Sequence, residues 1–296
     1  MTPEISIHIE PLEDAIRHLG SKTVVGSRLR SAGWQGVPLA LRDRAQFSAG
    51  VESMLYLNRV SENLLKIASL ERTRLADPTA PLMDREEFIA QLREVGLEEG
   101  LRPRQGELVD TIQDPTAYRR AKLIFDVQTQ KAEGFSYWKT HNDADVIDAA
   151  PAQELYRLEE RDFPRNWPQR WREASQAAGD GDAYRMLADN GRMIALIASG
   201  VWLNLGTMFD DSLGAPFPPF AFNSGMDVRA IERLEAEQLG LVAPGEKIAG
   251  NEINFNDALE KSVRDLSPGE QSQLEDFFGG QVTITDGVAK WTGGAA

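Results

Sequence analysis

The chain has 296 residues, 42% of them hydrophobic and 26% charged, which excludes a protein that is disordered throughout. It contains no cysteine, which excludes disulfides, thiolate nucleophiles and zinc sites built on cysteine. The formal net charge of −14 excludes a surface that coats duplex DNA as a whole, although a local basic patch stays compatible with it, and it favours a basic partner.

The amino-terminal segment carries no pattern of a basic stretch followed by an apolar one. Residues 1–14 are acidic and interrupted by proline, which is unlike a secretory signal peptide. No run approaches the ~20 apolar residues that a membrane span needs. We therefore expect a protein that is made and kept in the cytoplasm of the producing cell, without membrane contact.

Residues 1–45 are predicted to form an irregular arm. Ile5, Ile7 and Ile9 alternate with polar residues, which indicates a short strand, and a short helical pattern then ends at Gly20. The rest of the arm mixes glycine, serine and basic residues. We interpret it as a solvated connector, with docking on an acidic partner as the alternative.

Residues 46–140 are predicted to form a helical domain. Apolar stripes predict one helix over 42–75 and a second over 85–100, capped by Asp84. A central helix is predicted to start at Asp114 and Pro115, and Gly134 is expected to loosen or end it. These helices would pack as an antiparallel bundle.

Residues 141–245 are predicted to form a compact α+β domain that contains the densest aromatic strings. Patterns of apolar, proline and glycine residues predict the following elements. They are a helix over 151–161, a Trp/Arg-rich loop over 161–172, a loop with a short helix over 172–192, a buried strand and helix over 193–206 that the pattern alone does not establish, an extended proline-phenylalanine segment over 215–226, and an amphipathic helix over 227–240 capped by Asp227.

Residues 246–296 are predicted to form a tail of helices and a hairpin. A helix is predicted over 254–266, and a second helix is capped by Ser267, with Pro268 at its first position and Glu270 completing the capping box. Residues 281–291 read as a β-hairpin that turns at Asp286-Gly287. The predicted fold class is therefore mainly α with minor β (α+β), with a helical amino-terminal half and a compact α+β carboxy-terminal part ending in a hairpin.

The sequence offers few candidates for a reaction centre. Its three histidines, His8, His18 and His141, form no zinc-binding pair, and Ser224 lacks the strand-to-helix elbow of a hydrolase nucleophile. His141 and the acidic residues that follow it are the most metal-like cluster, although we interpret them as an acidic turn that caps the next helix. The carboxylates that a metal-dependent hydrolase would use are Asp143, Asp145 and Asp148.

Arginines alternate with aromatic residues between Arg161 and Arg172. This combination is typical of surfaces that stack bases and bind phosphates, but it is equally typical of internal cation–π packing. Neighbouring acidic residues neutralise much of the charge. We favour internal packing, and we keep a nucleic-acid-binding surface formed by the loop over 161–172 as an alternative.

Three strings in this order resemble the minor head proteins of tailed bacteriophages and prophages, the head morphogenesis family typified by the F protein of phage Mu. They are LIFDVQTQKAEGFSYWK (123–139), DAAPAQELYRLEERDFPRNWPQRW (148–171) and APFPPFAFNSGMDVRAIERLEAEQLGLV (215–242). The resemblance extends over roughly residues 40–290. Many members carry cysteine and histidine after the proline pair, as a metal or structural clasp. This chain has PPFAFNSGM there, so no metal site is carried over and hydrophobic packing is expected instead.

The resemblance implies a non-enzymatic protein that acts in head assembly with portal and capsid proteins, possible DNA contact and a link to DNA packaging or ejection. It implies a location in the host cytoplasm and then in the virion, and no catalytic residue, cofactor or metal. The residues that we name for interaction, each also expected to pack within the fold, are Trp138, Arg165, Trp167, Arg170, Trp171, Pro219, Phe220 and Phe222.

Overall fold

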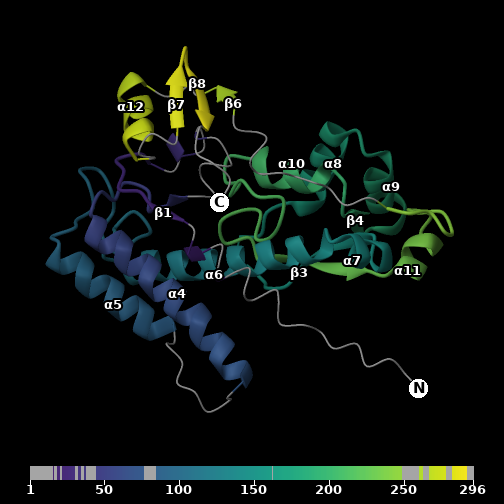
Figure 1. Cartoon of the computed structure of the whole chain (residues 1–296), viewed down its shortest axis with the longest axis horizontal. Helices are drawn as coiled ribbons and strands as arrows, with labels where there is room; N and C mark the ends of the chain where they lie inside the picture. Colours follow the sequence, from purple (N-terminus) through teal and green to yellow (C-terminus); the bar gives the residue numbers. More distant parts are fainter. Residues whose placement is uncertain are drawn as a thin grey trace.

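The computed structural model (Figure 1) describes residues 16, 19–20, 22–30, 33–34, 37, 45–76, 85–161, 163–248, 260–262, 267–277 and 282–291. The strand predicted over residues 5–9, His8, His18 and the cap at Asp84 lie outside this part of the chain. Helices dominate the described residues and the strands form small sheets, so the predicted fold class, mainly α with minor β, is confirmed. No described helix is long and apolar enough to cross a membrane.

The amino-terminal half is built on three helices, α4 (Met54–Ala76), α5 (Arg85–Glu98) and α6 (Tyr118–His141). Helices α4 and α5 run side by side (Figure 1), and α5 also packs on α6. Their shared core includes Tyr56, Phe88 and Leu92, all fully buried. Burial of these large apolar side chains is the main stabilising term of the bundle.

Helix α4 begins later than the predicted residue 42. The Ser53 hydroxyl accepts a hydrogen bond from the Tyr56 amide at 3.1 Å, which caps the helix at this point. Upstream, β1 (Thr23–Val24) pairs in parallel with β2 (Ala45–Gln46). Ala45 and Gln46, which lie within the predicted helix, therefore form a strand instead.

Helix α6 differs from its prediction both at its start and at Gly134. It begins at Tyr118, because Asp114 and Pro115 belong to the preceding loop, where the Asp114 carboxylate binds the Thr116 amide at 2.9 Å. The helix also continues through Gly134. A β-carbon on Gly134 would lie 2.2 Å from the Pro218 carbonyl oxygen, so this glycine permits a close approach of two segments.

The carboxy-terminal part contains a three-stranded antiparallel sheet, with β3 (Ala152–Arg157) between β4 (Met193–Leu196) and β5 (Met226–Ile231). The helices predicted over 151–161 and over the start of 227–240 were wrong. Strand β3 pairs with a neighbour on each side, and this pairing overrides the helical pattern. Glu154, only 7% exposed, binds Arg192 and Arg229 across the sheet.

Five shorter helices surround this sheet: α7 (Ala144–Ala149), α8 (Trp167–Ala178), α9 (Gly181–Asn190), α10 (Val201–Thr207) and α11 (Arg233–Gln238). The prediction of mainly loop over 172–192 was wrong, because α8 and α9 extend over most of it. Each of the two helices ends at a left-handed glycine, Gly179 or Gly191. A strand followed by a helix over 193–206 is what the structure has.

The tail contains β6 (Glu260–Ser262), α12 (Pro268–Phe277), β7 (Val282–Thr285) and β8 (Val288–Trp291). The hairpin at Asp286-Gly287 is confirmed, with both turn residues at positive φ. The helix predicted over 254–266 was wrong at β6, which pairs with β8. Val282 and Ala289 share a core with Val25 and Trp34, so the tail packs on part of the predicted irregular arm.

Candidate interaction site

The two tryptophans of the Arg/Trp-rich segment lie in the core. Trp167 is the first residue of α8 and Trp171 lies one turn later. Their side chains are 1% and 0% exposed. The Trp171 indole N–H donates to the Ala183 carbonyl at 2.9 Å, and its ring meets Trp202 edge-to-face at 5.2 Å. These two predicted interaction residues are therefore part of the hydrophobic core.

Two arginines of the same segment, Arg165 and Arg170, bind the chain itself. Arg165 and Arg170 both form ion pairs with Asp211, the latter at 2.8 Å, and we call these three residues the arginine clasp. Arg165 also donates to the carbonyl oxygens of Phe222 at 2.6 Å and Asn223 at 3.2 Å. The clasp thus ties the start of α8 to both ends of the segment over 209–223.

The Arg170 guanidinium contacts two aromatic rings as well as the Asp211 carboxylate. Its guanidinium carbon lies 4.5 Å from the centre of the Phe209 ring and 5.4 Å from that of Trp167. Burial opposes the ionisation of Asp211, but hydrogen bonds from Arg170 and Arg165 outweigh it and hold the pKa of this carboxyl below its ordinary value. This geometry matches the internal cation–π interpretation rather than a phosphate-binding surface.

The proline-aromatic segment lies over a hydrophobic surface and places most of its rings inside. Pro219 and Phe220 are buried, whereas Phe222 is 37% exposed. Phe217 is buried and contacts the half-buried Trp138 at 6.1 Å between ring centres. Of the interaction residues predicted in this segment, only Phe222 lies at the surface.

Phe163 is a surface residue that our set of interaction residues omitted. Its side chain is 93% exposed and lies between Arg161 and Arg165 in the chain. The sequence signal was present, because Phe163 belongs to the same alternation of aromatic and basic residues as the two tryptophans. Periodicity does not distinguish which of these aromatic residues faces solvent.

The acidic cluster serves the local fold. Asp143 caps α7 by accepting the Asp145 amide at 3.0 Å, and Asp148 pairs with Arg233 at 2.5 Å. His141 stacks on Tyr137 with ring centres 3.7 Å apart, and burial lowers the pKa of the imidazole. The predicted capping role is confirmed, and within the described ranges no three histidine, aspartate or glutamate side chains are grouped as metal ligands.

An apolar cavity of about 350 Å³ borders the clasp. Its apolar wall combines side chains from α6, from the amino-terminal segment and from the loop before α6, including Phe47, Val127 and Ile112. Asp211 of the clasp and the predicted residue Phe222 also line the cavity. A mainly apolar cavity of this size with a few polar groups is typical of a binding site.

A second, more polar cavity of about 470 Å³ lies between α6, the proline pair and the start of β5. Glu133, Tyr137 and Asp227 line it. Burial raises the pKa of Asp227, whose carboxylate accepts the Val228 amide at 2.8 Å. Burial, followed by the nearby Asp227 and Tyr156, also raises the pKa of Tyr137.

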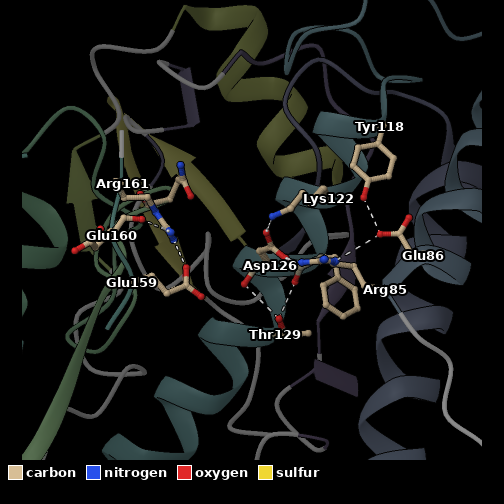
Figure 2. Close-up of polar contacts among 11 residues, drawn as sticks. Arg85, Glu86, Tyr118, Lys122, Asp126, Thr129, Glu159, Glu160 and Arg161 are labelled. Atoms are coloured by element: carbon tan, nitrogen blue, oxygen red, sulfur yellow. Dashed lines mark hydrogen bonds and ion pairs between the residues drawn. The ribbon is translucent and has the colours of Figure 1, made fainter. Parts of the chain in front are cut away.

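Figure 2 shows the polar groups on the neighbouring part of α6. The Tyr118 hydroxyl donates to Glu86 of α5 at 2.7 Å, and Lys122 forms an ion pair with Asp126 (Figure 2). Arg161 pairs with Glu159 at 2.6 Å in the loop after β3. Glu160, also labelled, takes part through its backbone carbonyl, which accepts from Arg161 at 3.2 Å (Figure 2).

No protein-family model, no curated protein and no solved structure matches this chain.

Proposed function

We propose that this chain is a non-enzymatic minor head protein of a tailed phage or prophage, acting in head assembly through contacts with portal or capsid proteins. The observation that supports the proposal best is that the three resembling strings pack on one another. Gly134 of the first string contacts Pro218 of the third, and Arg165 of the second binds Phe222 of the third. Strings far apart in the sequence thus form one unit, as parts of a shared domain would.

The surface chemistry is consistent with a role in protein–protein contact. Phe163 and Phe222 are exposed, and aromatic side chains are enriched at the centres of protein interfaces. The net charge of −14 suits a partner with a basic surface. In this proposal the protein is in the host cytoplasm during assembly and then in the virion.

Co-expression with the portal and major capsid proteins of the phage or prophage that encodes this chain tests the proposal. We expect the purified chain to carry portal protein with it through size-exclusion chromatography, with both identified by mass spectrometry. A folded chain that elutes free of both proteins would contradict the proposal. A double variant, Phe163→Ser with Phe222→Ser, is expected to weaken the complex if the exposed aromatic residues contact the partner.

A further inference from the structure

The loop between α5 and α6 has three solvent-exposed apolar side chains. Leu108, Val109 and Ile112 are 67%, 73% and 55% exposed. Single exposed apolar residues are common on protein surfaces, but three within five consecutive residues make a local patch. We call residues 108–112 the apolar loop. It lies far from the clasp in the sequence, and none of the predicted interaction residues lies within it.

Hydrogen bonds within the apolar loop hold its backbone in one conformation. The Leu108 amide donates to the Gln113 side chain at 3.1 Å, and the Thr111 hydroxyl donates to the Leu108 carbonyl at 2.8 Å. The Asp110 amide donates to Asp114 at 3.0 Å, and Asp110 itself has a positive φ of 57°. A surface that is already ordered loses less conformational entropy when it binds.

The carboxylate of Asp114 is the centre of this bracing. It is 4% exposed and accepts the Asp110 amide together with the amide and the hydroxyl of Thr116. Burial opposes its ionisation, but these hydrogen bonds outweigh burial and hold its pKa below the ordinary value. The loop is therefore supported by a buried charged group, although its own apolar side chains face water.

The apolar loop is also fixed to the body of the molecule and continues into the cavity. The Arg120 guanidinium donates to the Ile112 carbonyl at 2.8 Å and to the Ala49 carbonyl at 2.6 Å. Ile112 lines the cavity of about 350 Å³ that Phe222 also lines. Apolar surface thus runs from the exposed loop into a cavity that can receive a side chain.

The charge around the loop indicates what binds there. Between Arg93 and Asp114 the sequence has six acidic and three basic residues. Four of the acidic residues are exposed, namely Glu94, Glu98, Glu99 and Asp110. Two of the arginines, Arg93 and Arg104, donate to backbone carbonyls of the fold. A second copy of this chain would bring another −14 to the surface, so repulsion disfavours it. A partner that carries lysine or arginine beside apolar anchors complements both properties.

We propose that the apolar loop is a docking surface for a basic protein segment, which packs apolar side chains on Leu108 and Val109 and inserts one beside Ile112 into the cavity. The proposal rests on the proposed function in one respect, because a portal or capsid protein would present this segment. The surface itself is argued from exposure, bracing, the cavity and charge.

A labelled peptide tests this surface without any phage protein. The probe is a short helical peptide built only of leucine and lysine, and its counterpart has glutamate at every lysine. Fluorescence anisotropy with the full chain is expected to show binding of the lysine peptide alone. The triple variant Leu108→Ser, Val109→Ser, Ile112→Ser is expected to bind it at least tenfold more weakly. Leu234→Ser, at a 66% exposed position on α11, is the matched control and is expected to bind as the wild type does.

The proposal is overturned if the triple variant binds the lysine peptide as tightly as the wild type does, or if the glutamate peptide binds equally well. Co-expression of the same variants separates the two proposals. If portal protein co-purifies with wild type and triple variant alike, the docking surface is wrong and the proposed function stands. If the wild type binds the peptide through the loop but neither phage protein, the proposed function is wrong and the docking surface stands.

Discussion

At the scale of single residues, Asp211 determines what the neighbouring arginines can do. Its two oxygens pair with Arg165 and Arg170, whose side chains are 24% and 19% exposed. An arginine held in this way is not available to a phosphate. The segment over 161–172 therefore resembles a nucleic-acid surface in composition, whereas the charges of Arg165 and Arg170 are balanced by a residue about forty positions later in the chain.

Asp211→Ala is expected to destabilise the protein by about 1–3 kcal/mol, because two partly buried arginines lose their counter-charge. Urea unfolding followed by circular dichroism measures the change. Asp210→Ala is the control. The Asp210 side chain, next to Asp211 in the sequence, is exposed, so its removal should lower the free energy of unfolding by less than ~0.5 kcal/mol. Equal stabilities of the two variants would contradict a structural role for the clasp.

At the scale of elements, local signals and distant contacts give different answers. The amphipathic patterns of α4 and α5, helix α12 and the Asp286-Gly287 hairpin are local, and these were predicted correctly apart from their ends. Strand β3 was predicted as a helix because its sequence has helical spacing. Its two partner strands lie about forty and seventy residues later, and they decide its conformation.

Gly134→Ala distinguishes local propensity from tertiary packing within α6. Propensity alone predicts a gain of about 1 kcal/mol, whereas the added β-carbon would lie 2.2 Å from the Pro218 carbonyl oxygen. Because that atom is backbone, we expect the variant to be destabilised by about 1–2 kcal/mol in urea unfolding. Gly181→Ala, with open space around its β-carbon, is the control and should be neutral or stabilising. A stabilised Gly134→Ala would show that the two segments do not approach closely.

At the scale of the whole molecule, three buried or half-buried carboxylates share one property. Burial opposes the ionisation of Asp114, Glu154 and Asp211, and hydrogen bonds or arginines outweigh it, so the pKa of each is lowered. One group acts in the opposite direction, because burial raises the pKa of Asp227. The acidic protein thus uses some of its carboxylates as structural ions that join separate elements.

The free energy of unfolding is expected to fall in acid. A carboxylate with a lowered folded-state pKa stabilises fully above its unfolded pKa, about 4, and loses this contribution as pH falls through the folded value. Asp227 has the opposite sign, and its stabilising effect is lost as pH rises through its raised folded pKa. Because three carboxylates have lowered pKa values and one has a raised pKa, we expect a lower free energy of unfolding at pH 3 than at pH 7. Urea unfolding at the two pH values measures the difference. Asp211→Asn should show a smaller loss, and equal stability of the wild type at both pH values would contradict this account.

The sequence by itself determined the fold class, the main helices of the amino-terminal half and the final hairpin, because apolar periodicity and turn residues act within a few positions of the chain. Only the tertiary structure decided that β3 is a strand and that Gly134 lies close to the Pro218 carbonyl. It also decided that Arg165 and Arg170 pair with Asp211, and that the apolar side chains within 108–112 are exposed. These features depend on which distant segment supplies the hydrogen bond, the charge or the buried surface, and no local pattern specifies that partner.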